Sequence, residues 1–380
     1  MRVFSPNADE SDFINFIDFG YDLRLAALLY FLCPSLHMRT KRLGKESSQI
    51  VTLDMVAKES GVSPSTVSRI LNGTATVSED KKKSVDAAIA KLGFVPNPVA
   101  RGLAGGRTLS IGVVSQALDS PFYGAALRGI EDELDPAGYS PLFVSAHWNQ
   151  ASEARCIDML RARRVDGLIL LNGRMSDTAL KAIAKNIPVV VTDRHIKGTG
   201  LFSLNFDNFN GGFQATQHLI QLGHRRIAFI SGDPGHPDAN ERFKGYVSAL
   251  EAAHIAFNPD LVVPGEYHEI SGLLAVDRLL ASQQQFTAIF AANDQMAFGA
   301  ALSLHRHSLR IPDDVSLMGF DDLANSLYCV PPLSTIHQPA YELGRLAAAS
   351  MLQLLAGQKP TAVMPSPVLI ARESTRRLRT

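Results

Sequence analysis

Hydrophobic residues recur at helical spacing in two short segments around residue 60. If the segment 53–60 (LDMVAKES) is a helix, one face of it carries Leu53, Val56, Ala57 and Ser60. Gly61 permits a tight turn, and the segment 64–71 (PSTVSRIL) predicts a second helix. Ser63 is a good N-cap for it, and Pro64 occupies the first helical position, where its missing N–H costs nothing.

The spacing of these two helices is that of a helix-turn-helix. Helices that cross steeply need a small residue at the contact, here Ala57, and a residue free to take positive φ, here Gly61. Val67 supplies the apolar residue that fixes the second helix. A third helix is expected from Ser78 and should end at Gly93.

From residue 109 onward, apolar segments of strand length alternate with amphipathic segments of helix length. The expected strands are 109–115, 141–146, 166–171, 188–192, 226–231, 287–292 and 315–320. The expected helices include 150–163, 208–222, 239–253, 270–282 and 293–307. This alternation predicts doubly wound parallel sheets with helices on both faces, and the number of strands favours two lobes.

Charge is distributed unevenly, although the formal net charge is zero. Residues 38–107 carry 12 basic and 6 acidic side chains, whereas the rest of the chain is slightly acidic. A basic module on a neutral body is typical of a protein that binds a polyanion. The three cysteines are far apart in sequence, which argues against a disulfide framework or a zinc site and fits the cytoplasm.

The first residues do not resemble a targeting signal. The apolar run 23–33 (LRLAALLYFLC) is too short to span a bilayer, and acidic rather than basic residues precede it. We therefore expect residues 1–49 to be an extension, with Met38 as the natural start. The expected domains are this extension, a helix-turn-helix domain at 50–96, a hinge at 97–108 and a core at 109–375.

In a helix-turn-helix the second helix enters the major groove with its N-terminus first. Ser65 and Arg69 would then face the base edges, and Arg69 could bind a guanine through O6 and N7. Thr66 and Ser68 suit phosphate contacts. The remaining residues assigned to this surface are Ser63, Pro64 and Asn72. The alternative is a three-helix domain that contacts protein.

Two segments resemble the lactose-repressor (LacI/GalR) family. Residues 51–73 (VTLDMVAKESGVSPSTVSRILNG) are similar to its N-terminal signature, and 93–114 (GFVPNPVARGLAGGRTLSIGVV) to its hinge. The resemblance implies a homodimer on a palindromic operator of double-stranded DNA. It also implies a hinge helix at 98–104 that inserts Leu103 at a central CpG step, with Asn97 and Ala100 near the groove.

Polar residues follow four of the predicted strands directly: Asn172, Asp193, Asn293 and Asp321. Clefts in parallel α/β folds form beyond the carboxyl ends of strands. Each residue alone could cap a helix or build a turn. Together they favour a pocket for a polyol or sugar.

The segments 292–300 (ANDQMAFGA) and 315–339 (VSLMGFDDLANSLYCVPPLSTIHQP) resemble the core of the same family. The resemblance implies a two-lobed periplasmic-binding-protein-like core. The positions that match its effector contacts are Asn172, Asp193, Arg242, Tyr267, Asn293 and Asp321, and two aromatic residues resemble those of its first lobe, Phe122 and Tyr123. Purine-binding members share this fold, and the chain has no leucine heptad after the core, which favours a dimer.

The sequence thus predicts a repressor that a small sugar-like effector releases from its operator. A regulator that needs a purine or another metabolite as co-repressor is an alternative. A transporter's solute-binding protein would need an export signal and would not need residues 50–107. No GxxxxGK[ST], GxSxG or HExxH motif is present, so we expect no enzyme, no cofactor, no metal and no membrane partner.

Overall fold

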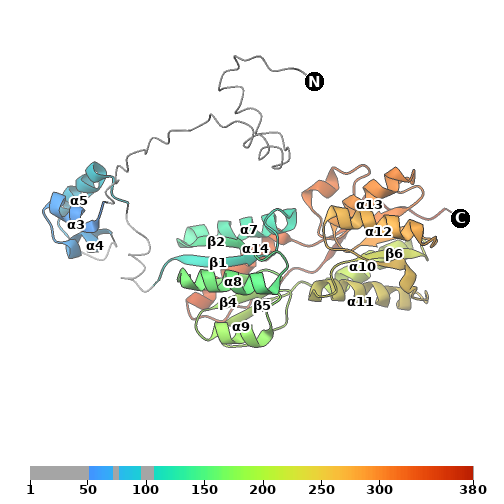
Figure 1. The fold of residues 1–380 in the computed structure, drawn as a ribbon, viewed down its shortest axis with the longest axis horizontal. Coiled ribbons are helices and arrows are strands. Elements are labelled where there is room, and N and C mark those ends of the chain that lie inside the picture. The colour runs from blue at the N-terminus through green and yellow to red at the C-terminus, as the bar shows by residue number, and fades with distance from the viewer. Residues whose placement is uncertain (1–50, 72–76, 96–106, 380) are drawn as a thin grey trace, which may run out of the picture. The chain divides into compact units, whose positions relative to one another are not determined.

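The computed structural model describes residues 51–71, 77–95 and 107–379, and the chain forms two compact units, Met1–Val95 and Pro96–Thr380. Figure 1 shows the elements of each unit. The expected extension and nearly all of the expected hinge, including Asn97, Ala100 and Leu103, lie outside the described residues, as does Asn72.

The described residues of the first unit form three helices, α3 (Leu53–Ser60), α4 (Pro64–Leu71) and α5 (Glu79–Leu92). Their buried core consists of Val56, Ala57, Val67, Val85, Ala88 and Phe94. Gly61 has a φ of 70° at the end of α3, and the Ser63 hydroxyl accepts a hydrogen bond from the Thr66 N–H at 3.3 Å. Ser78 precedes α5 as its N-cap instead of being its first residue. The predicted helix-turn-helix is therefore confirmed.

The first lobe of the second unit is a parallel sheet in the order β2-β1-β3-β4-β5. Its strands are β1 (Ser110–Ser115), β2 (Ser140–Ser145), β3 (Gly167–Leu170), β4 (Val189–Thr192) and β5 (Leu201–Leu204). Its helices are α7 (Pro121–Leu134), α8 (Gln150–Ala162), α9 (Asp177–Ala184) and α14 (Ala340–Leu355), with a short 3-10 turn at Asp135–Ala137.

Both faces of this sheet are covered, and its inner strands β3 (GLIL) and β4 (VVVT) are apolar at nearly every position. Ile169 points into the cluster that contains the apolar residues of α7 and α14. Leu168 and Leu170, its neighbours in sequence, point into a second cluster with residues of α8 and α9. This arrangement follows from the alternation of side chains along a strand.

The second lobe is a parallel sheet in the order β7-β6-β8-β9. Its strands are β6 (Ile227–Ser231), β7 (Val262–Pro264), β8 (Ala288–Ala291) and β9 (Ser316–Met318), and its helices are α10 (Asn208–Gln221), α11 (Pro237–Ala252), α12 (Glu269–Ala281) and α13 (Asp294–Arg306). Short 3-10 turns occur at Pro259–Leu261 and Ala324–Leu327, and β10 (Thr335–His337) pairs antiparallel with β11 (Val368–Ile370).

The chain passes repeatedly between the lobes. It enters the second lobe after β5, returns with α14 to pack beside α7, and leaves again to reach β11 (Figure 1). Gly344 permits close contact between α14 and α7, because a Cβ atom there would lie 1.8 Å from the carbonyl oxygen of Ala126. The first lobe is therefore built from two segments that are distant in sequence.

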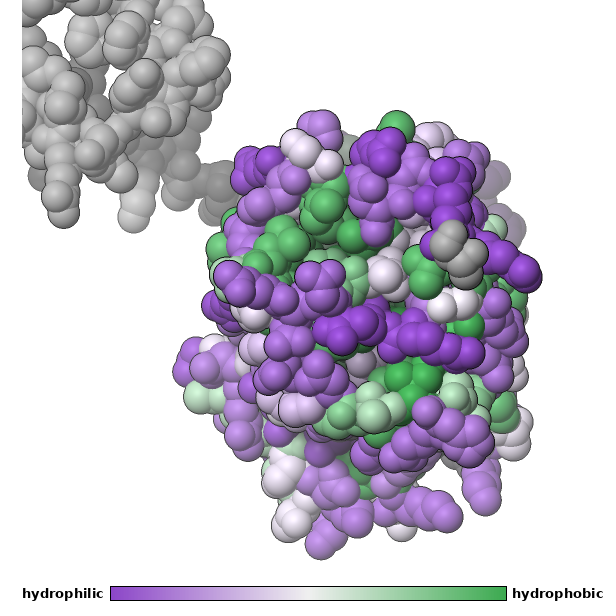
Figure 2. Space-filling view, turned by 90° about the vertical axis from the view of Figure 1, so that its right-hand side faces the viewer, coloured by the Kyte–Doolittle hydropathy of each residue, from purple (hydrophilic) through white to green (hydrophobic). Residues whose placement is uncertain are grey.

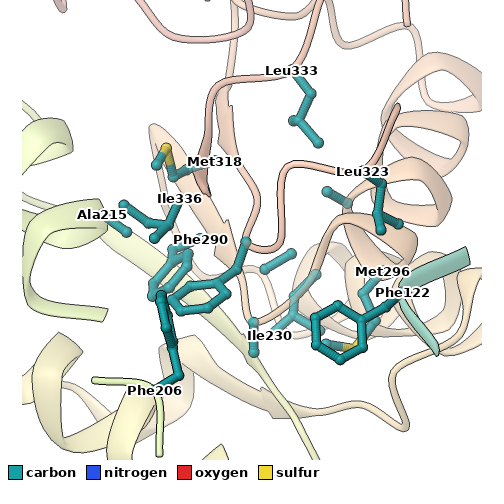
Figure 3. Packing of buried hydrophobic residues seen from close by; sticks show 14 of the residues in the cluster. Phe122, Phe206, Ala215, Ile230, Phe290, Met296, Met318, Leu323, Leu333 and Ile336 are labelled. Atoms are coloured by element: carbon teal, nitrogen blue, oxygen red, sulfur yellow. The ribbon is translucent and has the colours of Figure 1, made fainter. Parts of the chain in front are cut away.

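Hydrophobic packing also joins the lobes. Phe122 of α7 lies beside Met296 of α13 in the buried cluster, and Phe206, after β5, packs near Phe290 and Phe320 (Figure 3). The face at the end of the second lobe is mostly hydrophilic, with smaller hydrophobic areas between the polar side chains (Figure 2).

All seven predicted strands are present, each within a few residues of the predicted bounds, and the predicted fold class is confirmed. Four strands were not predicted, namely β5, β7, β10 and β11. Three of these are only three residues long, so they carry little periodicity. Among the described residues, no helix is long and apolar enough to cross a membrane.

Candidate functional site

The exposed face of α4 carries the residues predicted to contact DNA. Val67 is fully buried against α3 and α5, which turns Ser65 and Arg69 toward solvent. Thr66 and Ser68 are half-buried. The Ser63 hydroxyl lies 3.0 Å from the Ser65 hydroxyl and 2.8 Å from that of Thr66. The N-terminal turn of α4 therefore presents hydroxyl groups beside an exposed guanidinium, as phosphate and base contacts require.

A cavity of about 710 Å³ lies between the two lobes of the core. Seven of the eight predicted effector residues line it: Phe122, Tyr123, Asn172, Arg242, Tyr267, Asn293 and Asp321. Asp193, the eighth, is 8% exposed and is not part of the lining, so its contact with an effector stays a prediction.

The ends of the parallel strands bring these polar residues together. Asn172, Asp193 and Asp321 follow β3, β4 and β9, and their φ angles of 51°, 55° and 114° are positive. Asn and Asp tolerate the left-handed region better than other side chains, which suits them to these sharp strand exits. Asn293 follows β8 and caps α13, with its Oδ1 accepting from the Met296 N–H at 2.9 Å.

Arg242 of α11 is the buried cation of the site, with 3% exposure. Its Nε donates to Asn208 Oδ1 at 2.8 Å, its Nη2 to Gln338 Oε1 at 2.8 Å, and its Nη1 to the carbonyl of Ala292. Nη1 also lies 3.7 Å from Asp321 Oδ1. Of the five guanidinium donors, three are thus engaged by the protein itself, which limits how far Arg242 can bridge a ligand.

Three buried carboxyl groups surround this cation: Asp193, Asp238 and Asp321. Burial raises the pKa of Asp193 to about 7, with a further rise from Asp238 and an opposing effect of Arg242. Burial also holds the pKa of Asp321 well above its ordinary value, although Arg242 lowers it. The sequence interpretation missed Asp238. Its position four residues before Arg242 on one helical face was the available signal.

Aromatic rings form the walls of the cavity. Trp148 and Tyr267 are nearly parallel, with centroids 6.1 Å apart and an angle of 21° between their planes. Tyr123 lies 6.0 Å from Trp148, and the His236 ring contacts the same indole at 4.3 Å. The sequence interpretation also missed Trp148, which lies three residues beyond the end of β2.

Polar contacts join the lobes beside the cavity. Arg174 of the first lobe pairs with Asp233 of the second and donates from Nε to His236 Nε2 at 3.1 Å. Burial lowers the pKa of His236, so its neutral imidazole can accept this bond. The Glu153 carboxylate accepts from the backbone N–H of Arg174 at 2.5 Å, which fixes the loop that carries it. Ser120 also donates to Gln295 at 2.9 Å across the lobes.

Two family models match the chain, "Bacterial regulatory proteins, lacI family" over residues 52–97 and "Periplasmic binding protein-like domain" over 216–375. The HTH-type transcriptional repressor PurR of Haemophilus influenzae is 33% identical over 334 residues, which cover 86% of this chain and 99% of that protein. PurR of Yersinia pestis is 34% identical over 330 residues, with coverage of 86% and 97%.

Solved structures show the same relationship. The lac repressor dimer bound to operator and the anti-inducer ONPF is 31% identical with a TM-score of 0.77, covering 86% of this chain and 99% of that one. The complex of the transcriptional regulator CelR with cellobiose is 31% identical with a TM-score of 0.65, with coverage of 85% and 99%. The chain therefore belongs to the lacI family of bacterial regulatory proteins and is a DNA-binding transcriptional repressor.

Proposed function

We propose that this repressor acts in the cytoplasm as a homodimer that binds a palindromic operator through α4, and that a small sugar-like effector in the interlobe cavity releases it. Val67 is buried and anchors α4, while Ser65 and Arg69 on the same helix are exposed, and this arrangement supports the DNA contact. Two-fold symmetry of a dimer matches a palindromic site.

Selection of the purified protein against a random duplex library tests the DNA-binding part of this proposal. We expect an enriched palindrome with a central CpG step. Arg69→Ala should then weaken binding by about 1–3 kcal/mol, roughly 5–150-fold, and relax preference at one base pair of each half-site. Arg163→Ala, which removes an exposed guanidinium from the core, is the matched control. Binding without an enriched sequence would contradict the proposal.

Leu103, the proposed minor-groove wedge, is tested on the same operator. Leu103→Ala should weaken operator binding and leave effector binding intact, because kinking of the duplex depends on the inserted side chain. Unchanged operator affinity would rule out this role.

The segment 327–330, at and just beyond the end of the 3-10 turn Ala324–Leu327, suits contact with a second copy. Leu327, Tyr328 and Val330 are apolar and are 56%, 79% and 98% exposed. A cluster of exposed apolar side chains is typical of a protein interface. Val330→Glu should therefore raise the dissociation constant of the dimer in sedimentation, and a dimer unaffected by it would use another surface.

The lining of the cavity supports a sugar as effector. The ring of Tyr267 beside Trp148 suits the apolar face of a pyranose, and the amides and carboxylates suit its hydroxyl groups. We expect sugar binding to favour one arrangement of the lobes, with a coupling to DNA binding of about 1–3 kcal/mol. Asp321→Asn should lose this response and keep operator affinity, as measured by fluorescence anisotropy of labelled operator.

A purine co-repressor is the second candidate, because relatives named PurR match over nearly their whole length and a flat purine also fits between aromatic walls. The two candidates change operator affinity in opposite directions. A sugar that acts as inducer lowers operator affinity, whereas a purine that acts as co-repressor raises it. Operator titrations with free aldoses, disaccharides, guanine and hypoxanthine distinguish them.

A further inference from the structure

Two carboxylate oxygens beside the cavity have no hydrogen-bond partner in the part of the chain that the structure describes. They are Oδ1 of Asp238 and Oδ2 of Asp193. Both side chains are more than nine-tenths buried, with exposures of 6% and 8%. A buried acceptor without a donor costs about 1–3 kcal/mol. A ligand in the cavity that donates to the Asp238 oxygen would remove this cost at that residue.

The other oxygen of each carboxyl group is held by the protein. The Tyr267 hydroxyl donates to Asp238 Oδ2 at 3.3 Å, and the Asn208 amide donates to Asp193 Oδ1 at 3.5 Å. These contacts orient both groups, and Asp238 is itself part of the cavity lining. The two groups are close enough that Asp238 contributes to the raised pKa of Asp193.

The charges around the cavity oppose an anionic ligand. Its lining contains the carboxyl groups of Asp119, Asp233, Asp238, Glu266, Glu269 and Asp321. The cations of the lining are Arg242, whose donors mostly serve Asn208, Gln338 and Ala292, and Arg278, which is exposed. Asp233 pairs with Arg174 and Asp321 lies 3.7 Å from Arg242, but the excess of carboxyl groups over cations in the lining still opposes a phosphate or carboxylate placed here.

We propose that Asp238, assisted by Asp193, is the residue that determines effector class, because it accepts hydrogen bonds from adjacent hydroxyl groups of an uncharged polyhydroxy ligand. The effector is accordingly an unphosphorylated and uncarboxylated sugar or polyol. This inference rests on the proposed function of the cavity. It adds that the ligand is uncharged and that Asp238 discriminates against a charged one.

Calorimetric titration of the full chain with paired probes tests this inference. The pairs are glucose and glucose 6-phosphate, galactose and galactose 6-phosphate, and ribose and ribose 5-phosphate, with cellobiose, guanine and hypoxanthine in addition. We expect at least one free sugar to bind. The phosphorylated form of that sugar should bind at least 100-fold more weakly; if the sugar is cellobiose, the form to compare is cellobiose 6-phosphate.

Substitutions then assign the discrimination to Asp238. Asp238→Asn keeps an acceptor but removes the charge, so it should weaken binding of the free sugar and reduce the penalty on the phosphorylated one about tenfold. Asp193→Asn should act in the same direction. Asp260→Asn is the control, since it removes an exposed carboxylate outside the lining and should change neither affinity. Thermal melting checks that each variant is folded.

The outcomes separate the two levels of the proposal. Phosphorylated sugars that bind as tightly as free ones, or an unchanged penalty in both folded Asn variants, would overturn the inference and leave a sugar effector in place. Binding of guanine or hypoxanthine alone would overturn both the inference and the proposal that the effector is a sugar. Binding of none of the probes would count against the proposed effector class as a whole.

Discussion

Replacement of Arg242 by Met should destabilise the core, and the loss should grow with pH. Met keeps apolar contact with the Phe320 ring, over which the guanidinium lies at 3.7 Å. It removes the cation that faces Asp321 and the donors to Asn208 and Gln338. The remaining carboxyl groups then lie in a buried site with no compensating charge from position 242.

The expected loss follows from these contacts. Removal of one partner from a buried ion pair costs about 3–5 kcal/mol, and each bond donated by a charged group contributes about 1.5–3 kcal/mol. Some relaxation and water entry will offset part of this, so we expect about 3–5 kcal/mol at pH 8. Because Arg242 lowers the pKa of Asp193 and Asp321, its loss raises both further. Below pH 6 Asp193, whose pKa is about 7, is largely protonated, and the loss should shrink by about 1–2 kcal/mol.

Urea unfolding followed by tryptophan fluorescence measures this effect in the core alone, since Trp148 is the single tryptophan of the chain and lies in the cavity wall. The double variant Arg242→Met/Asp321→Asn should recover part of the stability, because it removes the uncompensated carboxylate. A loss below about 1 kcal/mol, or a loss that is the same at pH 5.5 and pH 8, would refute the assignment of Arg242 as the cation that stabilises these acids.

Three further predictions concern the core. The pKa of Asp193 is about 7 in the folded chain and ordinary in the unfolded one, so the free energy of unfolding of the wild type should fall as the pH rises from 4 to 7. Asp193→Asn should flatten this slope in urea titrations. Gly299→Ala should cost about 1–3 kcal/mol in Tm-derived stability, because its Cβ would lie 1.7 Å from the Glu269 carbonyl oxygen, whereas Gly124→Ala, with open space, should be neutral or stabilising. Arg174→Gln should weaken the interlobe contact by about 1 kcal/mol and raise acrylamide quenching of Trp148; unchanged quenching would contradict this role.

The helix-turn-helix could be predicted from sequence because its determinants are local. Ala57, Gly61 and Val67 lie within eleven positions of one another, and each has a distinct steric requirement. The strands of both lobes could be predicted for a related reason, since strands buried on both faces are continuous apolar runs. Because clefts form beyond the carboxyl ends of parallel strands, Asn172, Asn293 and Asp321 could then be placed at the cavity.

The rest of the site depends on contacts that sequence patterns do not show. His236 and Gln338 reach the cavity from segments outside the predicted sheet edge, and Trp148 stands three residues beyond its strand. The rule that placed Asp193 at the edge of the sheet does not specify how deeply the side chain is buried there. Strands β10 and β11 are three residues each and are separated by a whole helix, so their pairing is determined by tertiary structure.

The return of α14 to the first lobe has a consequence for synthesis on the ribosome. The sheet of that lobe is complete at Leu204, yet the face that packs on α14 stays uncovered until Leu355 has emerged. The intervening stretch is about 150 residues, which at about 5–20 residues per second takes roughly 8–30 seconds. During that time the nascent chain exposes an apolar surface while the second lobe is still being made, so its yield in cells should depend on chaperones that bind the emerging first lobe.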